Sequence, residues 1–420
     1  MRRAGRKINT PAFLMNSIQS RFYDRSATLF VIWIGFIFST LSYWEGLVGS
    51  EIRIYITVTA YAFLGLAMLV KIPNILNVAF QIPFFKTYIF CFIVGTLVLP
   101  ANVSEFSSDW YCLLVSLIPL SLGLSSYYSP RMLERLFKLL SIVSAIVAVI
   151  VIKNRVGGVV ITTEFLVSEK NSLAVVWALS ALGLLFYVIR NPFRLINILW
   201  CGVYSVLFVC IVTSRARAAL LALFLTSAVL VIKKLGSFNV QKAIGLFFGT
   251  GIMIIVYLLF SGGFENVFQL IEESITMGRN VDDLDSLSSG RVAVYSLAVR
   301  EFFDSPFMGA LSTGLTLPWV HNYPLRLLAE FGIFGSLPYM VPYVFMCVIT
   351  LKGIFFKSAF EPVANWELGF HMSALILIIS MLEPTYPFGP GTVTGIAMFM
   401  LGLSIICRRR EMMGLVNPYI

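Results

Sequence analysis

The sequence predicts an all-α integral membrane protein with about twelve transmembrane helices. Of its 420 residues, 58% are hydrophobic and only 12% are charged, and the mean hydropathy is +0.88. A soluble chain of this length could not cover its surface with so few charges. Most apolar residues gather in runs of about 17–20 residues, the length that crosses a bilayer as a helix. The runs do not alternate apolar and polar residues, as the strands of a membrane barrel would.

Twelve apolar runs divide the chain. They fall at 27–43, 54–70, 87–100, 110–124, 136–152, 171–189, 194–212, 217–232, 243–260, 333–351, 367–382 and 391–406. The third and fourth are short, so we expect a tilted, kinked or re-entrant helix at each. No small-x-small cleavage site follows the first run, which indicates a retained span and not a removed signal peptide.

Positive charge in the loops predicts the orientation of the spans. With the N-terminus in the cytoplasm, 21 of the 31 Lys and Arg residues fall on the cytoplasmic side, and each loop there has at least two. The outer loops 101–109 and 383–390 have none. Since basic residues are retained inside, both termini are expected to be cytoplasmic. The net charge of +10 follows from this bias and from attraction to anionic lipid, and no pattern typical of nucleic-acid binding accompanies it.

One long polar stretch divides the spans into two groups. We expect a basic cytoplasmic arm at 1–26, spans one to nine at 27–260, an outer loop with the candidate site at 261–332, spans ten to twelve at 333–406 and a cytoplasmic tail at 407–420. The loop is expected to fold over the outer ends of the spans.

Local signals predict three helices in this loop. A short helix is expected at 264–277, and a second from about Arg291 to Phe303, ended by Ser305-Pro306. A third is expected from Pro324 to Gly332, because proline suits a first helical turn and glycine suits a helix end.

Ten basic residues fall on the outer side against the charge rule, and an anionic ligand there would explain them. They are Arg53, Lys153, Arg155, Lys170, Arg215, Arg217, Arg279, Arg291, Arg300 and Arg326. Arg215 and Arg217 form most of the link between spans seven and eight. Arginine keeps its charge and binds phosphate through paired hydrogen bonds, and a helix N-terminus adds N–H donors. The alternative is that both guanidiniums reach lipid headgroups.

Two elements of the loop are candidates for chemistry. Gly290 lets the backbone approach a ligand, and Arg291 places a cation in the first turn of a helix, where it opposes the helix dipole. His321 and Asn322 come just before the third helix, whose N-terminus disfavours imidazolium and leaves the ring free to accept a proton. The alternatives are a surface arginine in a capped turn and an aromatic residue at the membrane interface. His371 falls in an apolar run and is expected to be a buried structural residue.

Neither a metal nor a disulfide is indicated, and we expect no cofactor. The six cysteines all fall in apolar runs, without a Cys-x-x-Cys pair or a neighbouring histidine. They are interpreted as small buried apolar residues. Asp283-Leu284-Asp285 has the form of a metal-binding pair of carboxylates, but it lies in a loose turn.

Three elements resemble the bacterial O-antigen ligase and O-antigen polymerase superfamily of polytopic membrane glycosyltransferases. The elements are Arg217 with Leu221 (Arg-x-x-x-Leu); Ser289-Gly290-Arg291 with Phe302 and Ser305-Pro306-Phe307-Met308-Gly309; and His321-Asn322 followed after nine residues by Gly332-Ile333-Phe334-Gly335. The similarity covers about residues 171–340. It departs from the family at Ala216, where Ser or Thr is usual, and at Tyr295, where Trp is common.

The resemblance implies glycan transfer from an undecaprenyl diphosphate carrier to a sugar hydroxyl, on the periplasmic face of the inner membrane. Such enzymes invert the anomeric centre and use neither metal nor nucleotide. Arg217 and Arg291 would bind the diphosphate with help from Arg215, and His321 would take the acceptor proton while Asn322 orients it. The substrate-binding residues would also include Gly290, Arg300 and Arg326.

The acceptor is left open by the sequence. A ligase moves the glycan to the lipid A core, and an O-antigen, capsule or exopolysaccharide polymerase moves it to a second lipid-linked glycan. The match around His321 slightly favours a ligase. A polysaccharide transporter or flippase is the alternative from another class. It would carry charged or broken-helix sites near the middle of the membrane and two related halves, and neither is evident in the sequence.

Overall fold

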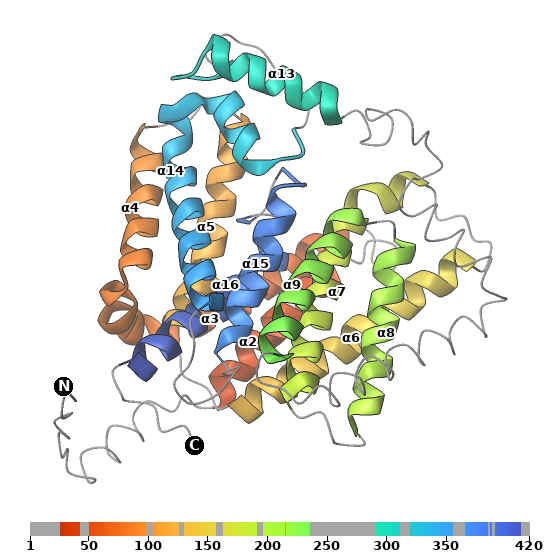
Figure 1. Ribbon diagram of the computed structural model, residues 1–420. Coiled ribbons are helices and arrows are strands. Elements are labelled where there is room, and N and C mark those ends of the chain that lie inside the picture. Colours follow the sequence, from red (N-terminus) through yellow and green to blue (C-terminus); the bar gives the residue numbers. More distant parts are fainter. Residues whose placement is uncertain are drawn as a thin grey trace, which may run out of the picture.

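Helices account for all the regular secondary structure in the described part of the chain. The computed structural model describes residues 26–42, 50–98, 104–125, 130–156, 163–190, 196–214, 216–235, 291–310, 320–355, 366–384, 387–388 and 391–412. The α-helices are α2 (Ser26–Ser42), α3 (Ser50–Val78), α4 (Pro83–Val98), α5 (Ser104–Leu124), α6 (Pro130–Val156), α7 (Thr163–Arg190), α8 (Ile196–Thr213), α9 (Arg217–Leu235), α13 (Arg291–Asp304), α14 (Tyr323–Phe355), α15 (Glu367–Ser380) and α16 (Gly391–Met412). They form a bundle, and α13 lies across one end of it, over the start of α14 (Figure 1).

The described helices support an all-α membrane protein. A helix covers each predicted apolar run except residues 243–260, which lie outside the described part, as do the predicted helix at 264–277 and both terminal segments. Three of them, at Tyr55–Gln81, Asn171–Arg190 and Tyr323–Phe355, are long and apolar enough to cross a membrane. The short fourth run belongs to α5, a helix of 21 residues that contains Pro119, because polar residues extend it at its start.

Helix α7 lies inside the bundle. Within its apolar segment Asn171–Arg190, 89% of the most apolar 18-residue stretch is buried. It packs against α6, α8, α9, α15 and α16. A helix that is apolar on every face is stable where neighbours cover every face. This position brings the first residue of the segment, Asn171, to the candidate site.

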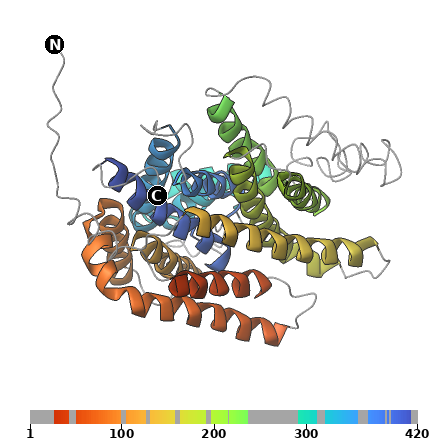
Figure 2. The ribbon, with the colours of Figure 1, turned by 90° about the horizontal axis from the view of Figure 1, so that it is seen from below.

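Helices α5 and α16 approach each other closely. A side chain at Gly123 would overlap the backbone of Phe399, and one at Gly402 would lie 2.6 Å from the carbonyl oxygen of Leu120. Small residues allow this contact, as is usual between helices in membranes. Figure 2 shows the blue C-terminal helices between the red and orange helices and the green ones.

Polar contacts distinguish the two ends of the bundle. Each joins residues that the loop charges predict to lie on the same side. The predicted cytoplasmic side has Lys233 with Glu367, Arg409 with the backbone of Gln81, and Trp366 with Glu411. The other side has Trp110 with Thr96, Asn171 with Glu383, and Arg291 with Glu383. We call the end that carries Glu383 the outer end; it is at the top of Figure 1.

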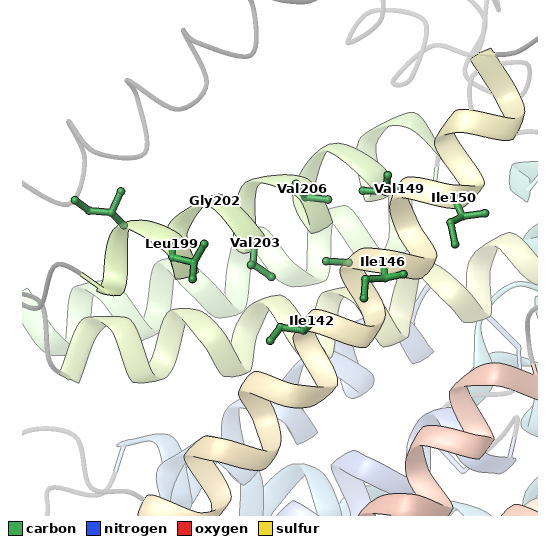
Figure 3. A pocket seen from close by; sticks show the side chains of 10 residues that line it. Ile142, Ile146, Val149, Ile150, Leu199, Gly202, Val203 and Val206 are labelled. Atoms are coloured by element: carbon green, nitrogen blue, oxygen red, sulfur yellow. The ribbon is translucent and has the colours of Figure 1, made fainter.

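An apolar groove of about 730 Å³ runs between α6 and α8. Ile146 and Val149 line it from α6, and Leu199 and Val203 line it from α8 (Figure 3). Its lining has no ionisable side chain, so it offers nothing that would hold a charged group. The candidate site lies elsewhere, at the outer end.

Candidate active site

Glu383 is the centre of a polar cluster at the outer end. It follows α15 by three residues, and its side chain is only 10% exposed. One carboxylate oxygen lies 3.4 Å from Nδ1 of His321. The other lies 3.8 Å from Nη2 of Arg291 and accepts a hydrogen bond of 3.2 Å from the side-chain amide of Asn171. Residues from four separate segments therefore meet at one carboxylate.

The backbone of His321 is held by α13. The hydroxyl of Tyr295 donates a hydrogen bond of 2.6 Å to the carbonyl oxygen of His321. Burial raises the pKa of this hydroxyl, so it stays protonated and keeps donating at neutral pH. The imidazole itself is about one-third exposed. The ring is thus partly accessible, while Nδ1 is buried near Glu383 without a hydrogen bond.

Asn322 links this histidine to the segment that carries Glu383. Its side-chain oxygen accepts a hydrogen bond of 2.9 Å from the N–H of Leu325, which makes it the N-cap of α14. Its side-chain amide donates 3.2 Å to the carbonyl oxygen of Met381. The predicted helix start near Pro324 is confirmed, and Asn322 positions His321 relative to Glu383.

Two glycines join the end of α13 to α14. Gly309 and Gly332 have φ of 71° and 64°, and a side chain at either one would overlap the backbone that carries the other. Gly332 interrupts α14 with a non-helical backbone, which confirms the predicted helix end there. The N–H groups freed by this break are satisfied, since Ile333 donates to the carbonyl oxygen of Pro306 and Phe334 to that of Phe307. The glycine-containing elements on both sides of His321 are one structural unit.

Arg291 is the first residue of α13, as expected, and its side chain is 26% exposed. Nη1 donates a hydrogen bond of 3.2 Å to the carbonyl oxygen of Leu382, next to Glu383. The nearby carboxylate offsets the unfavourable position of a cation at a helix N-terminus. A guanidinium has five N–H donors, so these contacts leave others for an anion.

Arg217 begins α9, and its residue is half-buried. Helix α9 packs against both α7 and α15, whose outer ends bring Asn171 and Glu383 together. The first turn of α9 is thus at the end of the bundle where the cluster lies (Figure 1). Arg215 and Gly290 lie outside the described residues.

The other two predicted arginines contact other acidic residues. The side chain of Arg300 is 78% exposed and lies 3.7 Å from Asp304 on the outer surface of α13. Arg326 is mostly buried, pairs with Glu330 at 3.7 Å and lies over the ring of Tyr323. Neither of these ion pairs involves a residue of the cluster around Glu383.

Sequence reasoning missed Glu383 and Asn171. Each stands at the outer limit of a predicted apolar run, Asn171 as the first residue of 171–189 and Glu383 directly after 367–382. One feature of the sequence could have indicated Glu383: an acidic residue at the outer end of an apolar run, on the same side as the loop 261–332 with its arginines. His371 is fully buried, as predicted.

The arrangement suits proton abstraction next to a bound anion. Histidine and carboxylate together form a base with an orienting partner, and arginine supplies fixed positive charge. Among the described residues, no group of three or more His, Cys, Asp and Glu side chains could hold a metal ion. No protein-family model and no curated protein matches the sequence.

Proposed function

We propose that the protein is a glycosyltransferase that moves a glycan from undecaprenyl diphosphate to a sugar hydroxyl, at the periplasmic face of the bacterial inner membrane. One observation carries the proposal: the Glu383 carboxylate contacts both His321 and Arg291. A base and an anion-binding group are thereby adjacent at the end of the bundle where the loop charges predict the outer surface. The reaction that the sequence resemblance implies, glycan transfer from a lipid diphosphate, needs both a base and an anion-binding group.

His321 acts as the general base. Nδ1 is buried 3.4 Å from a carboxylate oxygen of Glu383 without forming a hydrogen bond. A small rotation of the imidazole would let Nδ1–H donate to that oxygen, which would favour the tautomer that carries its proton on Nδ1. Nε2 is then the nitrogen that accepts a proton from the acceptor hydroxyl. Glu383 also stabilises the imidazolium that forms, as the carboxylate of a catalytic triad does. A positioned base of this kind contributes about 10²–10⁴ to the rate.

Arg291 and Arg217, with Arg215, bind the diphosphate and stabilise the charge that develops on it. Guanidinium binds phosphate oxygens through two parallel hydrogen bonds. The Glu383 contact of Arg291, at 3.8 Å, is longer than a hydrogen bond, so a phosphate oxygen can replace it. The carbonyl oxygen of Leu382 keeps the guanidinium in place during that exchange.

The bond changes balance without another reactant. The acceptor oxygen forms a bond to the anomeric carbon as its proton passes to Nε2 of His321. The bond between that carbon and the carrier phosphate breaks, and its electron pair leaves on the diphosphate. Attack from the face opposite the leaving group inverts the anomeric centre.

Two acceptors fit this chemistry, the lipid A core for a ligase and a second lipid-linked glycan for a polymerase. Transport of a polysaccharide across the membrane is the alternative from another class. The ion pair of 2.7 Å between Lys233 and the buried Glu367 does not favour it, because the pair lies at the predicted cytoplasmic end, whereas a transport pathway would carry such charges near the middle of the membrane.

Transfer by the purified protein in vesicles tests the proposal. Lipid-linked oligosaccharide is supplied with lipid A core or with a second lipid-linked oligosaccharide, and the product is identified from its mass by mass spectrometry. We expect His321→Ala and Arg217→Ala to abolish transfer, and Asp304→Asn, which removes an exposed carboxylate of α13, to preserve it. Full transfer by both site variants would overturn the proposal.

A deletion strain separates the remaining alternatives. Loss of a ligase leaves bare core while polymer stays on the lipid carrier, and loss of a polymerase leaves core with a single repeat. An unchanged glycolipid profile with altered passage of a solute would favour the transporter.

A further inference from the structure

One face of α14 is apolar and exposed along its whole second segment. The residues recur every third or fourth position, and each is between 37% and 73% exposed. They are Phe334, Leu337, Val341, Val344, Val348, Leu351 and Phe355. Because α14 is long and apolar enough to cross a membrane, this α14 stripe is the face that lipid covers.

The stripe does not end where the helix breaks. The ring of Phe307 stacks on that of Phe334, with 5.5 Å between centroids. Next to Phe307, Met308 is 61% exposed, and Phe303 at the end of α13 is 72% exposed. We call Phe303, Phe307 and Met308 the outer patch; through Phe307 it adjoins the outer end of the α14 stripe.

Helix α13 has the side-chain arrangement of a helix that lies at a membrane surface. Its underside is marked by the buried Ala298. On the exposed side, Val299 and Phe303 project on one flank, and Arg300 and Asp304 project on the other, together with Leu297, which is 37% exposed. A helix with one apolar and one charged flank lies at the boundary between hydrocarbon and water.

We propose that the outer patch is inserted into the outer leaflet of the membrane and anchors α13 there. Several apolar side chains this exposed near one another are unfavourable in water. The contact of Phe307 with Phe334 joins the patch to the α14 stripe, so the lipid that covers the stripe also reaches the patch. The anchor holds α13 parallel to the membrane, across the ends of the spans (Figure 1).

This proposal concerns the position of α13 and does not depend on the transfer reaction. It has a consequence for that reaction, because Arg291 is the other end of the same rigid helix. An anchor at Phe303 holds Arg291 near the depth of the lipid headgroups. A diphosphate on a lipid carrier lies at that depth.

Spin labels in vesicles of phosphatidylethanolamine and phosphatidylglycerol test the insertion. The full-length chain, with its six cysteines replaced by alanine, carries one label at a time through Phe303→Cys or Phe307→Cys. Arg300→Cys and Asp304→Cys are matched controls on the other flank, and Val344→Cys is the reference in the stripe. Collisions with oxygen, which concentrates in hydrocarbon, are compared with collisions with a water-soluble nickel chelate.

We expect the oxygen-to-nickel ratio at 303 and 307 to approach that at 344 and to exceed that at 300 and 304. A ratio at 303 and 307 equal to that at 300 and 304 would overturn the proposal. So would a label shielded from both reagents, since protein would then cover the patch.

A second measurement keeps the native cysteines. The fluorescence of the new tryptophan is the difference between the variant and the parent chain. Brominated phospholipids should quench this fluorescence in Phe303→Trp and leave it unquenched in Asp304→Trp. Equal quenching at the two positions would contradict insertion.

Discussion

Glu383 lies 3.4 Å from Nδ1 of His321, although the two residues come from opposite ends of a pair of helices, α14 and α15. The contact exists because Asn322 binds the carbonyl oxygen of Met381 and so brings the start of α14 against the end of α15. A histidine with a buried carboxylate behind it is a different chemical group from a histidine at a membrane interface. The predictions below depend on this pair and on the backbone that holds it.

Replacing Glu383 with glutamine should lower kcat by about 10² or more, within the range found for groups that work with a general base. The amide keeps the size of the side chain but cannot stabilise an imidazolium. KM for the acceptor should change little, because the proton moves only in the transition state. Transfer in vesicles measures both constants. A kcat within a few fold of the parent would exclude Glu383 from the reaction.

The effects of Glu383→Gln and His321→Ala should not add. If the two side chains act as one unit, removing the base already removes what the carboxylate contributes. The double variant should therefore transfer as slowly as His321→Ala alone. A double variant that is slower by the product of the two single effects would show that Glu383 acts separately, for instance by folding.

Arg291→Lys should weaken donor use although it keeps the charge. Lysine binds phosphate through one point charge and cannot make two parallel hydrogen bonds. We expect a higher KM for the lipid-linked donor together with a lower kcat, and a normal KM for the acceptor. Asp304→Asn, on the same helix, serves as the matched control. Unchanged donor kinetics would rule out diphosphate binding by Arg291.

Gly332→Ala should destabilise the outer end. The new side chain would overlap the backbone of Phe307 and Met308, at a residue with φ of 64°. A non-glycine residue in such a conformation costs about 1–3 kcal/mol before the overlap is counted. Gly65→Ala is the control, since a side chain there meets nothing within 4 Å. Thermal unfolding in detergent should show a lower Tm for Gly332→Ala alone; equal Tm values would refute the docked backbone.

Tyr295→Phe should remove the hydrogen bond to His321 and cost about 1 kcal/mol of stability. Because burial raises the pKa of the hydroxyl in the folded protein, the tyrosine contributes stability at all pH values below its unfolded pKa of about 10. That contribution is lost as the pH rises through the folded pKa. The parent should therefore lose stability at strongly alkaline pH more than Tyr295→Phe does. Denaturant unfolding at pH values from neutral to alkaline measures the difference, and parallel curves would contradict it.

The helices and several of their boundaries could be predicted because their signals are local. A run of apolar residues has to span or be buried wherever it lies, so α2, α7 and α16 follow from composition over a short window. The limits of α13 follow from Arg291 and Ser305-Pro306, and the break in α14 follows from Gly332, because glycine and proline act on their own backbone. Arg291 and His321 could be identified as candidates because a charged residue stands out in an apolar chain and because the sequence has only two histidines.

The chain's residues alone thus determined an α-helical membrane protein, several of its helix limits and the residue types able to bind an anion and move a proton. Only the tertiary structure decided that Glu383 and Asn171 lie together with His321. No local pattern encodes which of several outer carboxylates meets a given histidine. That choice follows from how α7, α13, α14 and α15 pack, and packing depends on contacts between residues far apart in the sequence.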